Sequence, residues 1–199
     1  MNEIKNVIEN RKFEDIKDCK FVSDSERKLI LLGIEILKTI KTYRQDCNSL
    51  HERITKKEGA LASFSSRLFL SKSTFFQDSI HEKYYLTLNK QAKQIKELIK
   101  SVNNNELQNV IADAIMQDIT VPANAIEKKF IRINYDADDY IFHDMIAYIS
   151  NDTLNKIYSD FINRRVSSIL PNQKKLIKEL KQEFKNRDIS VPKKPFKLF

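Results

Sequence analysis

The residue pair best suited to metal chemistry is His143-Asp144, an imidazole followed directly by a carboxylate. Two more carboxylates, Asp136 and Asp139, precede it at helical spacing. At about 100° per residue, these two carboxylates and His143 fall within about 60° on one helix face. Two carboxylates and an imidazole on one face suit a divalent cation. The residue types therefore raise the hypothesis of a metal-dependent enzyme.

The pair invites comparison with the HD metal-dependent phosphohydrolases, an all-helical family that also needs an upstream His and a downstream Asp, but we do not claim a resemblance to them. Candidates for these are His51 or His81 upstream and Asp152 or Asp160 downstream. In that family a glycine commonly follows the pair, but none follows it here. A match of two adjacent residues also carries little information. A phosphohydrolase using His143-Asp144 is therefore kept only as a second alternative.

The apolar spacing around the pair favours a solvated helix start over a metal site. At helical spacing, a second side of the helix, away from Asp136 and His143, is apolar and consists of Phe142, Met145, Ile146 and Ile149. Acidic residues are also favoured in the first turn of a helix by its dipole. We therefore predict that Asp136, Asp139 and His143 are exposed and hold no metal, and we assign no catalytic residue and no cofactor.

The scarcity of glycine limits both the chemistry and the fold. The chain has two glycines, Gly33 and Gly59, and four prolines in 199 residues. It therefore contains no GxSxG, P-loop or GxGxxG motif, which leans against an enzyme. Tight hairpin turns need Gly, Asn-Gly or Asp-Gly pairs. We predict an all-α helical bundle, with more than half of the residues helical and no sheet of three or more strands.

Two long helices are predicted in the first half of the chain. Ser23 to Glu26 match a capping box that opens a helix over 24–56. Its apolar residues alternate in steps of four and three, the heptad spacing of a coiled-coil seam: Ile36, Ile40, Tyr43, Cys47, Leu50 and Ile54. A second helix over 77–102, after a connection of about 20 residues, suits an antiparallel pair. We expect Ile36, Ile40, Leu50 and Ile54 to be buried. The spacing leaves open whether the seam pairs within one chain or in a homodimer.

Shorter helices are predicted elsewhere. The sequence favours one at 2–19, one from Leu107 to Ile119, and one whose first turn contains Pro122. Further helices are expected to start at Asp136 or Asp138, at Asn151 or Asp152 (running to about Ile169), and at Pro171. Residues 1–190 then form one helical domain, with a subdivision near 103–105 into a long hairpin and a short-helix bundle as an alternative, and 191–199 form a tail.

Cysteine usage and hydropathy favour the cytoplasm. Cys19 and Cys47 cannot form a disulfide framework, and neither belongs to a CxxC pair. The first residues contain no continuous apolar stretch of the kind found in signal peptides. No apolar run approaches the ~20 residues of a membrane-spanning helix.

Two rows of lysines are the clearest surface signal in a chain of net charge +8. The first row is spaced by four, three and four residues, within about 60° of one helix face: Lys174, Lys178, Lys181 and Lys185. The second lies on the 77–102 helix: Lys90, Lys93, Lys96 and Lys100, preceded by Lys83. Either row could bind phosphates or a partner, or be an ordinary solvated face. The acidic segment 101–150 could also neutralise the rows internally.

The heptad seam, the polarised charge and the missing catalytic motifs favour a non-enzymatic helical interaction protein, such as an adaptor, regulator, inhibitor or immunity-type factor. Its partner is then another protein, which the sequence does not identify. The alternative is a nucleic-acid-associated protein that binds phosphate backbones through its lysine rows.

Overall fold

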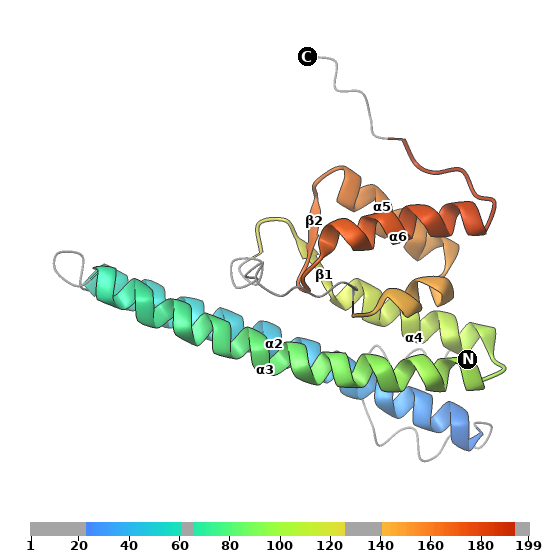
Figure 1. Ribbon diagram of the computed structural model, residues 1–199, viewed down its shortest axis with the longest axis horizontal. Coiled ribbons are helices and arrows are strands. Elements are labelled where there is room, and N and C mark those ends of the chain that lie inside the picture. The colour runs from blue at the N-terminus through green and yellow to red at the C-terminus, as the bar shows by residue number, and fades with distance from the viewer. Residues whose placement is uncertain (1–22, 61–65, 126–140, 194–199) are drawn as a thin grey trace.

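The computed structural model describes residues 23–60, 66–125 and 141–193 of the chain (Figure 1). Two long helices come first, α2 (Asp24–Ala60) and α3 (Ser66–Ser101). They are followed by α4 (Asn105–Asp118), strand β1 (Thr120–Pro122), the 3-10 helix η3 (His143–Tyr148), α5 (Asn151–Ile162), strand β2 (Val166–Ser168) and α6 (Gln173–Asn186). The fold is all-α, as predicted, and the strands of the described part form one two-stranded sheet.

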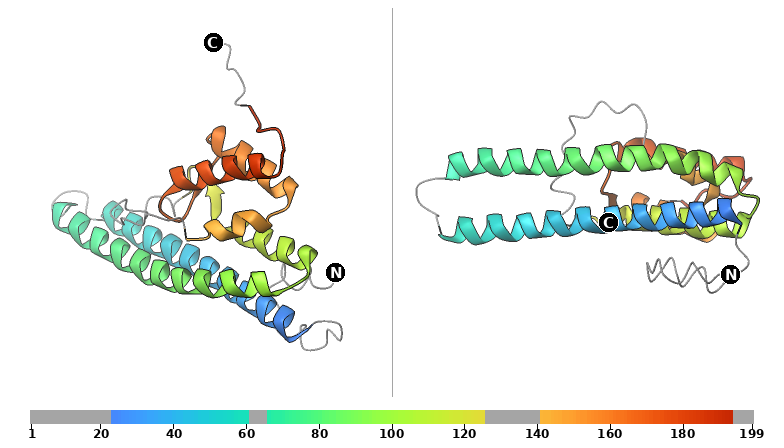
Figure 2. Two further views of the ribbon diagram at one scale, coloured as in Figure 1. Left: turned by 45° about the vertical axis from the view of Figure 1, so that its right-hand side comes forward. Right: turned by 90° about the horizontal axis from the view of Figure 1, so that it is seen from below.

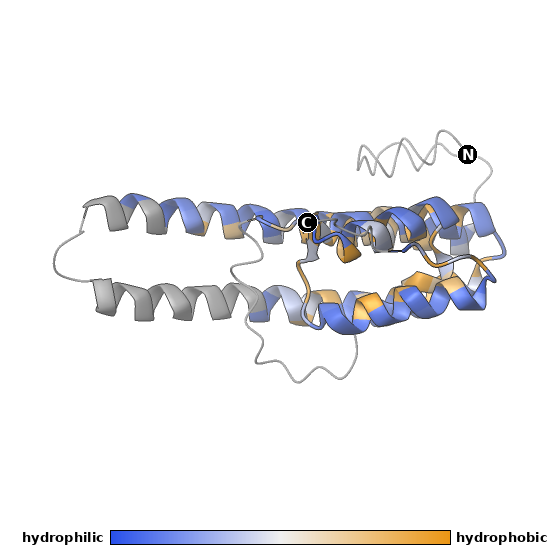
Figure 3. Ribbon diagram, turned by 90° about the horizontal axis from the view of Figure 1, so that it is seen from above, coloured by the Kyte–Doolittle hydropathy of each residue, from blue (hydrophilic) through white to orange (hydrophobic). Residues whose placement is uncertain are grey.

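Helices α2 and α3 form an antiparallel hairpin, and the shorter elements stack on one side of one end of it (Figure 1). The other end of the hairpin extends beyond them. Seen from below, α2 and α3 lie side by side in front and the short elements lie behind (Figure 2). The hairpin therefore has one covered face and one face that the described short elements leave open. Apolar residues gather on the inner sides of the helices (Figure 3).

The residues of the heptad seam pack against α3 of the same chain. The seam residues Ile36, Ile40, Tyr43, Cys47 and Leu50 are all buried, as expected, and the side chain of Ile54 lies outside the described residues. Apolar residues of α3 are buried opposite them, among them Tyr84, Leu88, Ile95 and Ile99. The rings of Tyr43 and Tyr84 lie 5.2 Å apart across the pair. Burial of these residues against each other supplies the main hydrophobic stabilisation of the hairpin.

The predicted capping box is confirmed. The backbone N–H of Ser23 donates to the Glu26 carboxylate at 2.8 Å, and the N–H of Glu26 donates to the Ser23 hydroxyl at 3.3 Å. The amide of Asn104 also donates to Glu26 at 2.7 Å, while its oxygen caps α4 by accepting from the Leu107 N–H. Because Asn104 lies in the α3–α4 turn, this residue joins the starts of α2 and α4.

The boundaries of the long helices correct the sequence prediction. Helix α2 runs through Gly59 to Ala60, and α3 already begins at Ser66, so the expected connection of about 20 residues is wrong. Residues 66–76 contain neither glycine nor proline. Nothing in this stretch interrupts a helix, and its irregularly spaced phenylalanines do not prevent one.

Pro122 lies in strand β1 and does not start a helix. It pairs with Val166 of β2 at the end of the short antiparallel ladder, where the missing N–H of proline is tolerated. Helix α5 ends at Ile162, well before the expected Ile169, because Arg164 adopts a left-handed backbone (φ 57°) and the chain turns into β2. The predicted helix at 2–19, the helix start at Asp136 or Asp138 and most of the tail lie outside the described residues.

The hydrophobic core is continuous from the hairpin to the short elements. Gly33 lies where α4 crosses α2, and a Cβ at this position would lie 3.2 Å from Cγ2 of Ile111. Glycine therefore permits a close approach of the two helices. Beyond it, Phe142, Met145 and Ile146 are buried as expected, although they belong to a 3-10 helix and its N-cap where an α-helix was expected.

Arg187 holds the short elements together. Its guanidinium donates to the backbone carbonyls of Ile146, Ala147 and Ile149 at 3.0, 3.1 and 2.7 Å. Its Nε donates to the Glu183 carboxylate at 2.7 Å. One side chain at the end of α6 thus satisfies carbonyls at the end of η3, where a helix has no internal partners for them.

Candidate functional site

The His143-Asp144 pair is part of an ion-pair contact between η3 and α3. The Asp144 carboxylate lies 3.1 Å from the Lys96 ammonium and 3.3 Å from Nε2 of His143. His143 is only partly exposed, at 35% of its side chain, so the expectation that it is exposed holds only in part. Asp136 and Asp139 lie outside the described residues. Among the residues that are described, no three His, Cys, Asp or Glu side chains lie close enough to hold a metal ion.

The first lysine row is an exposed face of α6. Lys174, Lys178, Lys181 and Lys185 are all exposed, and Leu176, Leu180 and Phe184 of the same helix are fully buried. Within the described part of the chain, none of the four ammonium groups has a carboxylate within ion-pair distance. The row is therefore an uncompensated line of positive charge.

The second row is divided between different surroundings. Lys90, Lys93 and Lys100 are exposed on α3, but Lys96 is turned to η3 and paired with Asp144. Lys93 lines a groove between α2 and α3. Helix α6 lies on the far side of η3 from α3 (Figure 1). The structure therefore does not bring the two rows together as one basic strip.

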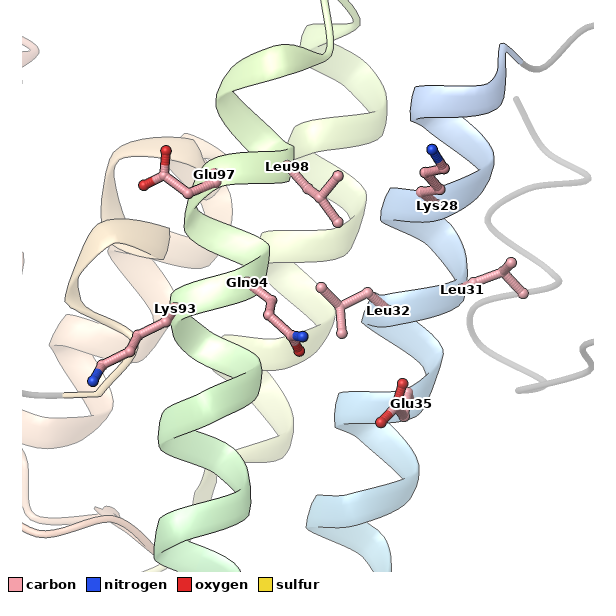
Figure 4. A pocket seen from close by; sticks show the side chains of 8 residues that line it. All are labelled: Lys28, Leu31, Leu32, Glu35, Lys93, Gln94, Glu97 and Leu98. Atoms are coloured by element: carbon pink, nitrogen blue, oxygen red, sulfur yellow. The ribbon is translucent and has the colours of Figure 1, made fainter.

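The groove between α2 and α3 is the site that the sequence did not reveal. It has a volume of about 850 Å³. Figure 4 shows Leu32 and Leu98 pointing toward one another from the two helices, with Gln94 between them, whereas Leu31 projects from the outer side of α2, away from α3. Charged side chains line the rest of it, Lys28 and Glu35 from α2 and Lys93 and Glu97 from α3. The groove thus has an apolar floor and a rim of both charges.

Leu31 gives the groove an exposed apolar edge. Of the large hydrophobic residues in the described part of the chain, two are exposed: Leu31, at 36%, and Leu86, at 59%. Leu31 lines the groove and Leu86 does not. The sequence signal for this edge was the run Leu29 to Leu32, which contains more apolar residues than a heptad seam uses. The sequence does not show that α4 covers another side of α2. Whether Leu31 is buried or exposed could therefore not be predicted from it.

Polar contacts continue from the groove along the hairpin. The amide of Gln91, which is 3% exposed, donates to the Glu35 carboxylate at 3.0 Å and to the Thr39 hydroxyl at 3.1 Å. This contact holds the rim carboxylate of Glu35 in place. Further along, the Tyr84 hydroxyl donates to the Asp46 carboxylate. Burial, and then this bond, raise the pKa of Tyr84 far above its ordinary value. Tyr84 therefore stays a neutral donor at any physiological pH.

Comparison with known proteins gives no match: no protein family, no curated protein and no solved structure is significantly similar to this chain. Among the described helices, none combines the length and the apolar content needed to cross a bilayer. The surfaces of the molecule are therefore what indicates a function.

Proposed function

We propose that this protein is a non-enzymatic interaction protein that binds a partner protein through the groove between α2 and α3. The occupant is an amphipathic helix of the partner. The observation that carries the proposal is Leu31, an exposed leucine beside an apolar floor; among the other described large hydrophobic residues, only Leu86 is also exposed.

The groove fits a helix better than an enclosed small ligand because it is open to solvent and bounded by two helices. A helix laid in such a groove buries its apolar side chains between the two rows, here against Leu32 and Leu98. The rim offers one lysine and one glutamate from each helix. An occupant with charges of both signs beside its apolar stripe would therefore be matched, whereas a strongly acidic or basic segment would meet like charges.

The compartment and the oligomeric state are part of the same proposal. The thiol of Cys47 is buried and not in a disulfide, which suits a reducing compartment such as the cytoplasm. A homodimer through the long helices would have to use surfaces outside the seam, since the seam is already buried within the chain. Leu31 and Leu86 would be the residues available for such a contact.

Site-specific photo-cross-linking tests the groove. A photo-reactive phenylalanine derivative replaces Leu31 in one variant and Leu86 in another, and both are irradiated in the cells that make the protein. The two positions are matched because both are exposed leucines on the hairpin, and only Leu31 lines the groove. We expect a discrete cross-linked partner from position 31, with the cross-link in one helical segment of that partner, and none from position 86.

Other outcomes would contradict the proposal in distinguishable ways. A cross-link from position 31 to residues 1–22 of the same chain would show that the groove is filled internally. A cross-link to a second copy would make the surface a dimer contact, which size-exclusion chromatography with light scattering would verify. Equal cross-linking at positions 31 and 86 would mean that the groove has no special role.

A further inference from the structure

The lysine row of α6 carries a second inference, independent of the groove. Four exposed ammonium groups follow one another along the helix at rises of about 6, 4.5 and 6 Å, calculated from 1.5 Å per residue. They form a nearly straight line of about 16 Å on one face, from Lys174 to Lys185.

The charge of this row is not cancelled within the described part of the molecule. The two carboxylates of α6, Glu179 and Glu183, lie more than about 100° around the helix from the row. Glu183 is bound to Arg187. Carboxylates of the acidic segment 101–150 could have neutralised the row. However, Asp144 pairs with Lys96 of α3, and Asp113 accepts hydrogen bonds from Ser150. The sequence left internal neutralisation open, and within the described residues it is found at α3 and not at α6.

The row is also held rigidly. At the start of α6, the side chain of Gln173 accepts a hydrogen bond from the Ser168 N–H at 3.0 Å. At its end, Arg187 binds the carbonyls of η3. The buried residues Leu176, Leu180 and Phe184 fix the rotation of the helix between these points. The lysines thus project from a fixed backbone, so a ligand that matches their spacing need not order the helix on binding.

Two kinds of polyanion could meet such a row, a membrane surface or a nucleic acid. A basic amphipathic helix binds membranes by inserting its apolar face among the lipids. The apolar face of α6 is already in the protein core, and its release would unfold the short-helix half. A nucleic acid needs only the charges, because lysine neutralises phosphates without reading bases.

We infer that the α6 row, Lys174, Lys178, Lys181 and Lys185, is a binding surface for the sugar–phosphate backbone of a nucleic acid. Binding is independent of base sequence and depends strongly on salt. With four phosphates neutralised, affinity should fall between about 50-fold and about 150-fold from about 50 mM to about 200 mM salt.

The test measures fluorescence anisotropy of a labelled DNA duplex and a labelled single strand, both of arbitrary sequence, with the purified full chain. One variant carries Lys174→Gln, Lys178→Gln, Lys181→Gln and Lys185→Gln. A matched variant carries Lys83→Gln, Lys90→Gln, Lys93→Gln and Lys100→Gln, four exposed lysines of α3. Both lose the same charge, and Lys96 is kept in both because it pairs with Asp144. Circular dichroism checks that both remain folded.

We expect the α6 variant to lose at least about tenfold in affinity at low salt and most of its salt dependence, while the α3 variant stays close to the wild type. Equal loss in both variants would overturn the inference, because net charge and not the row would then explain binding. No binding by the wild type at low salt would overturn it as well. So would retention on vesicles rich in phosphatidylserine without retention on either nucleic acid. If the α6 variant does not fold, the inference is tested by the salt dependence of the wild-type affinity and by the affinities of the single variants Lys178→Gln and Lys181→Gln.

Discussion

The long hairpin and the short-helix half are stabilised in different ways. In the hairpin, a regular apolar seam from Ile36 to Leu50 is buried against α3. In the short-helix half, individual side chains bind backbone groups of distant elements, as Arg187 does for η3 and Asp113 does for Ser150. A periodic seam tolerates many apolar sequences, whereas each of these side-chain contacts depends on one residue in one geometry. The two halves should therefore be sensitive to different substitutions. The difference also explains why the packing of the hairpin could be predicted from the sequence and that of the short-helix half could not.

Breaking the seam should have the largest effect. Replacing Ile40 by Ala removes a fully buried side chain from the centre of the hairpin and should cost ~2–5 kcal/mol of the free energy of unfolding. Urea denaturation measures it, and the exposed Leu86→Ala variant is the control, expected within about 0.5 kcal/mol of the wild type. An Ile40→Ala variant that unfolds at the wild-type urea concentration would mean that the seam is not close-packed.

The short-helix half should be most sensitive at Arg187. Replacement by Lys keeps the charge but loses the planar fork that reaches three carbonyls, and should cost about 1.5–3 kcal/mol. Hydrogen exchange should show the loss around η3 and α6 first, while the far part of the hairpin keeps its protection. Uniform loss of protection over both halves would show that the two are stabilised as one unit.

Glu26 links the two halves and should give a smaller, pH-dependent effect. The hydrogen bond from Asn104, followed by the one from Ser23, lowers the pKa of Glu26 below its ordinary value of 4.5. A pKa that is lower in the folded state than in the unfolded state stabilises the fold at pH values above the unfolded-state pKa. This stabilisation is lost as the pH falls through the folded-state pKa. Glu26→Gln should therefore cost about 0.5–1 kcal/mol at neutral pH.

The difference between Glu26→Gln and the wild type should shrink as pH falls below about 4.5. Thermal melts across that range measure it. A difference that is constant with pH would show that the charge of Glu26 contributes nothing and that only its shape matters.

Gly33→Ala should have the smallest net effect, because two contributions oppose each other. Alanine favours the helix by about 0.8–1 kcal/mol over glycine, but its methyl group would approach Ile111 to 3.2 Å. We expect little change in the wild-type background and clear stabilisation by the same substitution in an Ile111→Ala background. A double-mutant cycle measures the coupling. Equal stabilisation in both backgrounds would contradict the close crossing of α2 and α4.

Sequence patterns predicted the parts of the molecule that follow local rules. The capping box at Ser23 and the seam were recoverable because their spacing is set by one helix alone. Strand β1 at Pro122 and the early end of α5 were not, because they depend on pairing between segments far apart in the chain. The same limit applies to the sites. The α6 lysine row lies on one helix and was identified from spacing, whereas the groove is formed by two helices and appeared only when they were placed together.

The most direct test of the groove compares lysine acylation in native extract and in the purified protein, with mass spectrometry to read each position. Lys28 and Lys93 line the groove, and Lys41, an exposed lysine of α2 outside it, is the internal reference. The proposed function predicts that Lys28 and Lys93 react more slowly in the extract, also after nuclease treatment, while Lys41 reacts equally in both. Equal reactivity of all three lysines in extract and in the purified protein would contradict it.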